Sequence, residues 1–344
     1  MSTNKKNNIL KKNLISDNFL DLFLTLIVFI MIIIIISNPE KFSSGTISGL
    51  KLFFFNVLPG LFPFMLLTKL ITELKVIFKF CQKLDKFSYK IFGTPGISIY
   101  TFFMSILSGY PIGAKIISDL YEKRQIDEFE AKKMSIFCTT SGPIFIIGTV
   151  GVTMFKNYKF GVILYFSHIL SSFILGIIYN YLTKKKHNQS STSVMIKKPF
   201  LIDKNENIIS KCINETINSL FVVGAYITIF YLLGEIIESL GLFNILNNII
   251  LKPFKLFNLN QTHSSGFIYG LLEVTRGAKI LSQSATPSSL ILATGIISFS
   301  GLSIIMQSMA FLNKAKIKAH NFIISKCVHC VFSMILCYLI FIII

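Results

Sequence analysis

Charged residues are scarce in this sequence of 344 residues. Asp, Glu, Lys and Arg make up 15% of the chain and hydrophobic residues 52%, whereas a soluble domain carries about a quarter charged residues. Acidic residues are scarcer than basic ones: the chain has 16 Asp and Glu and 34 Lys and Arg, which gives a formal net charge of +18. This composition argues against an ordinary soluble domain. The lysine excess lies mostly in connecting segments, where positive-inside topology and lipid headgroups explain it better than a nucleic acid does.

Motifs of catalysis and cofactor binding are also missing. The sequence has no recognisable nucleophile–base spacing, no phosphate-cradling loop of the nucleotide-hydrolase type, no metalloprotease helix motif and no Rossmann fingerprint. Its six cysteines lie in or beside apolar runs. Cys327-Val328-His329-Cys330 has metal-like spacing but lacks the second ligand pair that zinc requires. We therefore expect neither an enzyme nor a bound cofactor. A coupling ion, H⁺ or Na⁺, is the one exception that stays open.

Long apolar stretches recur along the whole chain, and a stretch of about 18 residues is enough to cross the hydrocarbon of a bilayer. They are Asn18–Ser37, Thr46–Ile71, Gly96–Ile117, Met134–Phe155, Phe160–Leu182, Ile217–Leu240, Gly266–Leu281, Leu290–Leu312 and Cys327–Ile344. Backbone groups in lipid must be satisfied within the segment, so we expect helices, and the alternation of a membrane β-barrel is absent. No small-residue cleavage site follows the first stretch, which predicts a retained anchor rather than a signal peptide.

Two polar, lysine-rich segments divide the chain. Met1–Asp17 and Thr183–Ser210 both carry excess lysine, so both are predicted to be cytoplasmic. After one crossing by the anchor, an odd number of crossings is left for the first apolar half, and a unit of that kind reverses orientation when it is repeated. The predicted organisation is a tail and anchor (1–44), a first membrane repeat (45–182), a basic linker (183–209) and a second, inverted repeat (210–344).

Three landmarks recur in the same order in the two halves. Gly113-Ala114-Lys115-Ile116 returns as Gly277-Ala278-Lys279-Ile280, Tyr89-Lys90-Ile91-Phe92 resembles Phe254-Lys255-Leu256-Phe257, and Thr140-Ser141-Gly142-Pro143 resembles Phe299-Ser300-Gly301-Leu302. Each half is thus predicted to contain an opening helix, a basic amphipathic stretch (Leu74–Phe92 in the first), a helix interrupted at the Gly-Ala-Lys motif, a second helix interrupted at Ser-Gly, and a closing span. Matched interruptions in two halves are typical of transporter binding sites.

These motifs resemble the sporulation integral membrane protein YlbJ family, within the wider group that carries the nucleoside-recognition or Gate domain. The resemblance runs from about Gly45 to the C-terminus. It rests on Ser108-Gly109-Tyr110-Pro111 with Gly113-Ala114-Lys115, on Ser141–Gly151, on Glu273-Val274-Thr275-Arg276-Gly277, and on Phe299–Ser303 with Gln307. It implies an endospore-forming bacterium, a role in spore maturation, and passage of dipicolinate out of the mother cell across the outer forespore membrane. A nucleoside substrate does not carry over, because that likeness is at domain level only.

Arg276 is one of only two arginines in the chain, and it lies in an apolar half beside a glycine. An ionisable residue in a membrane segment suggests a functional site, although a structural pair with Glu273 is the alternative. Lys115 and Lys279 occupy matching repeat positions and either line the same site or snorkel towards headgroups. His168 is interpreted as a packing residue, and Glu235 and Glu238 as markers of a helix end or, less simply, a proton relay.

The small residues beside these cations either permit close helix packing or open the backbone for an anion. The predicted substrate-binding residues are Lys115, Arg276, Lys279, Glu273, Ser108, Gly109, Tyr110, Gly113, Ser141, Gly142, Thr275, Gly277, Ser300 and Gly301.

The sequence therefore predicts an all-α polytopic membrane protein with an anchor helix and two inverted repeats containing broken or re-entrant helices. The expected function is secondary transport of a small organic anion, most simply dipicolinate, because a planar dianion needs cationic partners and hydrogen-bond donors. A nucleoside or nucleobase carrier and a non-transporting sporulation scaffold are the alternatives. The expected partners are the anion and the lipid bilayer, with a homo-oligomer or other sporulation membrane proteins also open, and no nucleic acid.

Overall fold

The computed structural model describes residues 22, 25–73, 75–187 and 208–343, and this part of the chain is helical without strands. The first half contains α2 (Pro39–Lys51), η1 (Leu52–Val57), α3 (Leu58–Glu73), α4 (Lys75–Gln82), α5 (Asp85–Ile91), α6 (Ile97–Ser108), α7 (Ile112–Glu122), α8 (Glu128–Phe137), η2 (Ile144–Met154) and α9 (Tyr158–His187). The second contains α10 (Ile208–Ser239), α11 (Leu242–Lys255), α12 (Gln261–Leu272), α13 (Val274–Ser282), α14 (Pro287–Phe299), α15 (Gly301–Leu312), η3 (Asn313–Ala315) and α16 (Ala319–Ile343).

Four helices within the described residues are long and apolar enough to cross a membrane: Tyr158–Thr183, Ile208–Ser239, Pro287–Ala315 and Ala319–Ile343. A helix over Thr25–Ser37 and the one that follows it add a fifth if they form one bent span. The predicted all-α polytopic membrane protein is confirmed. Most of the basic tail and linker lies outside the described residues, so their sidedness, the division into repeats and the inversion of the second repeat stay predictions.

The first predicted span is not a straight anchor. The helix over Thr25–Ser37 meets Pro39–Phe55 at an angle of 106°. Pro39 explains the bend, because a proline has no N–H to continue the hydrogen-bond ladder and is well suited to a first helical turn. The chain then continues without a break through η1 and α3.

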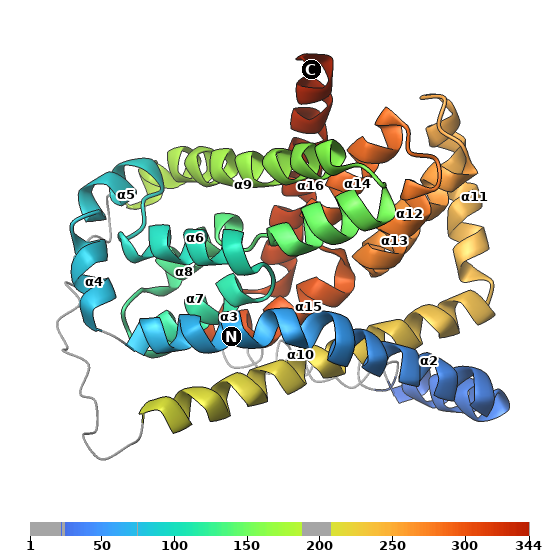
Figure 1. Ribbon diagram of the computed structural model, residues 1–344, viewed down its shortest axis with the longest axis horizontal. Helices are drawn as coiled ribbons and strands as arrows, with labels where there is room; N and C mark the ends of the chain where they lie inside the picture. Colours follow the sequence, from blue (N-terminus) through green and yellow to red (C-terminus); the bar gives the residue numbers. More distant parts are fainter. Residues whose placement is uncertain (1–21, 23–24, 74, 188–207, 344) are drawn as a thin grey trace, which may run out of the picture.

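The α2–η1–α3 helix lies beside α10, and the two run antiparallel (Figure 1). Near one end, a Cβ added to Gly49 would lie 2.9 Å from Cα of Thr228, so the backbones touch there. Near the other end, Lys69 of α3 reaches Glu215 in the second turn of α10. This pair of long helices forms one side of the molecule, and α9 runs along the opposite side (Figure 1).

The predicted basic stretch after α3 forms two short helices, α4 and α5. Apolar and basic residues alternate along α4 with helical spacing, and Lys90 lies in the last turn of α5, where a cation interacts favourably with the helix dipole. The amphipathic character predicted for this stretch fits both helices.

Each half contains two interrupted helices. In the first half the interruptions separate α6 from α7 at Gly109–Pro111, and α8 from η2 at residues 138–143. In the second half they separate α12 from α13 at Glu273, and α14 from α15 at Ser300. The predicted Ser-Gly interruptions are thus present in both halves.

The Gly-Ala-Lys motifs are not themselves interruptions, which corrects that detail of the prediction. Gly113-Ala114-Lys115 lies inside the first turn of α7, and Gly277-Ala278-Lys279 lies inside α13. The breaks come just before these motifs, where the local chemistry requires them. Pro111 lacks an N–H donor, and the Glu273 carboxylate accepts hydrogen bonds from the first free N–H groups of α13.

Candidate functional site

The two interruptions of the first half touch each other through glycines. Gly109 has a φ of +81°, which disfavours any side chain, and a Cβ built there would lie 2.6 Å from the backbone N of Gly142. The preceding Ser108 hydroxyl is buried and has no hydrogen-bond partner among the described residues. Residues Ser108, Gly109 and Gly142, predicted as site residues, therefore meet at one point where two stretches of non-helical backbone approach closely.

Glycines beside the interruptions of the second half also pack closely. A Cβ on Gly277 would lie 2.3 Å from Cα of Gly270, and a Cβ on Gly301 would lie 3.1 Å from the carbonyl oxygen of Gly270. Ser300 takes a left-handed conformation with φ of +81° and is buried. Gly113 packs against the end of α8 instead. A Cβ built on Gly113 would collide with the Cys138 carbonyl oxygen.

The open backbone between α8 and η2 is satisfied by side chains from other elements. The Nζ of Lys326 donates to the Thr139 carbonyl at 2.6 Å, and the Ser141 N–H donates to Nε2 of His168 at 2.9 Å. The Thr140 N–H donates to Oγ of Ser105 at 2.9 Å. Backbone groups freed inside a membrane protein need such partners. The predicted interruption therefore comes with its own polar surroundings.

The same side chains join the two halves. The Lys326 ammonium also donates to the Tyr110 hydroxyl at 3.0 Å, and Ser300 is a hydrogen-bonding neighbour of that hydroxyl. Nδ1 of His168 lies 2.8 Å from Oγ of Ser298. We call the resulting group the buried polar centre; it consists of Tyr110, Thr139, Ser141, His168, Ser298, Ser300, Lys326 and His329. It draws on α9, α16 and three of the four interruptions.

Lys326 is the only cation of the buried polar centre as defined. Its side chain is 1% exposed, and no carboxylate lies within ion-pair distance of it among the described residues. A buried ammonium without a counter-ion is costly. Two of its three N–H donors are used, by Tyr110 and Thr139, and its charge faces the Tyr110 and Phe322 rings, so one donor and the place of a counter-ion are left for a ligand.

A groove of about 300 Å³ adjoins the buried polar centre between α8, α9 and α16. Phe322 and Ser325, next to Lys326 on α16, line this groove. The Phe322 ring is itself buried, and its centroid lies 5.3 Å from Nζ of Lys326. Phe322 thus both lines the groove and lies close to the ammonium.

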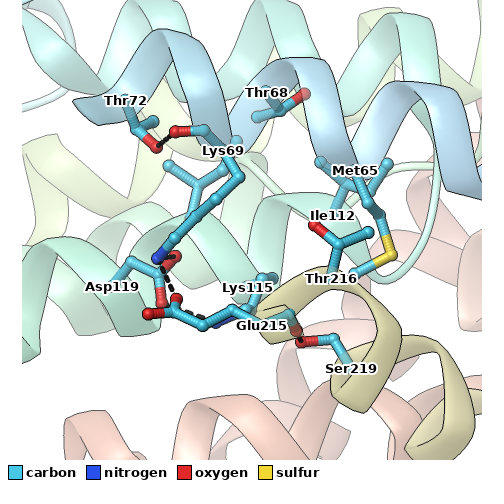
Figure 2. A pocket seen from close by; sticks show the side chains of 11 residues that line it. Met65, Thr68, Lys69, Thr72, Ile112, Lys115, Asp119, Glu215, Thr216 and Ser219 are labelled. Atoms are coloured by element: carbon cyan, nitrogen blue, oxygen red, sulfur yellow. Dashed lines mark hydrogen bonds and ion pairs between the residues drawn. The ribbon is translucent and has the colours of Figure 1, made fainter. Parts of the chain in front are cut away.

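A separate charged cluster joins α3, α7 and α10 (Figure 2). It consists of Lys69, Glu73, Lys115, Asp119, Lys123 and Glu215. Nζ of Lys69 lies 3.0 Å from Asp119 and 2.5 Å from Glu215, and Nζ of Lys115 lies 2.7 Å from Asp119. Three cations face three carboxylates, so the cluster is neutral as a whole.

The small cavity inside this cluster, of about 20 Å³, has room for roughly one water molecule. Asp119 lies past the apolar stretch of α7. Burial raises the pKa of its carboxyl, but the ammonium groups of Lys115 and Lys69 outweigh burial and lower the pKa overall. The carboxylate therefore stays ionised, which suits a structural ion-pair network better than a site for a free anion.

Arg276 also lies among carboxylates. Its guanidinium binds Glu235 at 3.4 Å and forms a shorter ion pair with Glu238, and it stacks 4.8 Å from the Tyr269 ring centroid. The alternative pairing with Glu273 is wrong, because that carboxylate caps α13 by accepting from the N–H groups of Thr275 and Arg276. The guanidinium thus fastens α13 to the end of α10.

The three predicted cations do not gather at one point in this structure. Lys115 belongs to the cluster at Glu215 and Arg276 to the one at Glu235, and the 20 residues of α10 between these positions span about 30 Å. Lys279 is exposed, without an ion pair among the described residues. Tyr110, Ser141 and Ser300, by contrast, come together at the buried polar centre. Substrate binding by any of these residues stays a prediction.

Comparison with known proteins gives one broad similarity. The chain is similar to the sporulation integral membrane protein YlbJ of Bacillus subtilis (strain 168), with 25% identity over 317 residues that cover 88% of this chain and 78% of that protein. The predicted resemblance to the YlbJ family is confirmed by this similarity. No family model matches the chain, and no solved structure matches it either. The wider Gate-domain grouping stays a prediction.

Two residues of the buried polar centre, Lys326 and His329, were not predicted from the sequence. Lys326 lies one residue before the apolar stretch predicted to begin at Cys327, and His329 stands out in the sequence only as part of a metal-like spacing. The rule that singled out Arg276, an ionisable residue within an apolar helix, applies equally to Lys326. His168, interpreted as a hydrogen-bonded packing residue, is hydrogen-bonded on both ring nitrogens.

Proposed function

We propose that this chain is a sporulation-associated secondary transporter or permease for a small organic anion, with dipicolinate as the favoured substrate. The setting, an outer forespore membrane, is proposed from the resemblance to the YlbJ family. No chemical conversion of the solute is proposed. The single observation that carries the transport proposal is the buried ammonium of Lys326, which lacks a carboxylate partner among the described residues.

The position of this ammonium supports a transport site over a structural one. It lies where interrupted helices from both halves converge, and secondary transporters bind their solutes at such junctions. A carboxylate of the solute would supply the missing counter-charge. The Tyr110 hydroxyl lies beside Lys326, Ser300 is a hydrogen-bonding neighbour of that hydroxyl, and the two hydroxyls offer further donors to a second carboxylate.

Transport by the purified protein tests this proposal. Vesicles that contain only this protein should take up labelled dipicolinate in a saturable manner, whereas protein-free vesicles of the same lipid should not. Labelled uridine and adenine, offered to the same vesicles, should stay outside. Uptake of uridine in place of dipicolinate would replace the proposal with a nucleoside carrier, and uptake of none of the three solutes would favour a scaffold.

A further inference from the structure

We propose that Nδ1 of His329 binds a proton together with each anion, so that anion movement is coupled to proton movement. This inference rests on the proposed function and assigns the coupling ion to the same site. It is argued from ring geometry, hydrogen-bond partners and the charges that face the ring.

His329 and His168 form a buried pair between α16 and α9. The two rings stack with centroids 4.8 Å apart and an interplanar angle of 29°. The side chains are 1% and 0% exposed, respectively. Two imidazolium ions held at this distance away from water would repel strongly. The pair therefore accepts one proton and not two.

The partners of His168 keep its ring neutral. Its Nε2 accepts the N–H of Ser141 at 2.9 Å, so this nitrogen must present a lone pair. Its Nδ1 then carries the hydrogen and donates to Oγ of Ser298 at 2.8 Å. Protonation of Nε2 would set two donors against each other and free a backbone N–H in the protein interior. His168 thus positions its neighbour and does not take up the proton.

The partners of His329 leave one nitrogen open. Its Nε2 lies 3.0 Å from the backbone carbonyl of His168, an acceptor, so this nitrogen carries the hydrogen. The Ser171 hydroxyl donates to the same carbonyl and presents its oxygen to Nε2 at 2.9 Å. Nδ1 therefore presents a lone pair, and it has no hydrogen-bond partner among the described residues. A proton added at Nδ1 breaks no existing hydrogen bond.

The charges around the pair explain why the proton should arrive with an anion. Lys326 lies one helical turn before His329, and the Tyr110 ring lies 6.5 Å from the His168 ring. The packing helices α14 and α15 contain no titratable side chain, and the buried lysine of α8, Lys133, is bound to Asn180. Lys326 is thus the charge that faces the pair, and it opposes protonation while the site is empty.

A dianion beside Lys326 reverses this balance. It supplies two negative charges, of which the ammonium neutralises one, so the field at Nδ1 then favours a proton. Because binding free energies are reciprocal, the proton must strengthen anion binding by the same factor. Dipicolinate with one ammonium and one imidazolium is neutral as a group, which suits passage through a low-dielectric interior.

Calorimetric binding of dipicolinate to the full-length purified chain tests the proposal. Titrations near pH 7.5 in two buffers with different ionisation enthalpies should report uptake of about one proton per anion. Between neutral and alkaline pH the affinity should rise about tenfold for each unit by which the pH falls. In His329→Gln, which keeps a donor for the His168 carbonyl, the affinity should fall to the value that the wild type shows at alkaline pH, and both the proton uptake and the pH dependence should disappear.

His320→Gln is the matched control, since His320 is exposed and lies at the start of the same helix. It should behave like the wild type. Dipicolinate binding by the wild type without proton uptake would overturn the proton site and leave the anion function standing. Absence of dipicolinate binding at every pH would overturn both. Undiminished proton uptake in His329→Gln would move the site elsewhere. If that variant does not fold, His329→Asn replaces it, and misfolding of both would assign His329 to the fold and overturn the proposal.

Discussion

Single glycines decide whether the interrupted helices can meet. A Cβ at Gly277 would lie 2.3 Å from Cα of Gly270, and neither backbone can move without displacing its helix. We expect Gly277→Ala to cost about 1–3 kcal/mol, as overpacked interiors do. Gly148→Ala is the control, because nothing lies within 4 Å of a Cβ at that position. Thermal unfolding in detergent should separate the two variants, and equal effects would contradict this packing.

Asp119 illustrates a carboxylate that the fold needs. It faces Lys69 and Lys115 and is 7% exposed. Asp119→Asn would leave both ammonium groups with one counter-ion fewer, a change that typically costs about 3–5 kcal/mol. Glu122→Gln should cost less than about 1 kcal/mol, because that carboxylate is 47% exposed in its pair with Lys314. Denaturant titration of both variants at neutral pH measures the difference.

The contribution of Asp119 to the stability of the fold depends on pH with a definite sign. Because the folded state lowers the pKa of Asp119, its contribution to stability is fully present above the ordinary pKa of a carboxyl. That contribution is lost as the pH falls through the lowered pKa. The stability gap between wild type and Asp119→Asn should therefore be constant around neutrality and close only in acid. A gap that widened in acid would contradict the ion-pair assignment.

Some residues of the candidate site could be predicted from the sequence, and others could not. Gly109, Tyr110, Ser141 and Ser300 could be singled out because small and hydroxyl residues inside an apolar stretch indicate either close helix packing or an opened backbone. The partner of Tyr110 could not be found this way. Lys326 is 216 residues distant in the chain, and one sequence contains no information on which of its 32 lysines returns to that point.

Between elements, Arg276 connects α13 to the end of α10. We expect Arg276→Gln and Glu238→Gln each to cost about 1 kcal/mol, since both side chains are partly exposed. The double variant should cost less than the sum, because the two groups bind each other. Arg276→Gln with Glu273→Gln should be additive, since Glu273 acts as a helix cap. Thermal unfolding of the single and double variants measures the coupling of Arg276 to Glu238 and to Glu273. Coupling to Glu273 alone would contradict the pairing with Glu238.

Whole elements were more predictable than their exact ends. Helices were expected throughout because backbone groups in lipid must be satisfied within the segment, and apart from the interruptions the described apolar stretches are helical. The interruptions lie a few residues before the Gly-Ala-Lys motifs, because Gly109 with its φ of +81° ends α6 and the Glu273 carboxylate caps the start of α13. The bend after Ser37 follows from Pro39, whose effect on the predicted anchor does not show in the length of the apolar stretch.

For the whole molecule, the prediction concerns the orientation of the two halves in the membrane. Lysine-rich Met1–Asp17 and Thr183–Ser210 are predicted to share the cytoplasmic side. Single cysteines at Ser2 and Ser191, placed in a variant without the six native cysteines, should react with an impermeant maleimide from that side only. Permeabilised cells provide the control for total reactivity. Labelling of the two positions from opposite faces would exclude an inverted repeat.

The anion site at Lys326 is the claim on which the proposed function depends, and dipicolinate binding and uptake by Lys326→Met test it most directly. Loss of a charge-assisted partner costs about 1.5–3 kcal/mol, so affinity should fall roughly ten- to a hundred-fold and uptake into vesicles with it. Thermal stability without ligand is measured alongside, because the variant removes both an uncompensated buried charge and the hydrogen bond to the Thr139 carbonyl. Lys318→Met, an exposed position next to the same helix, should match the wild type. Wild-type affinity and uptake in Lys326→Met would contradict the anion site.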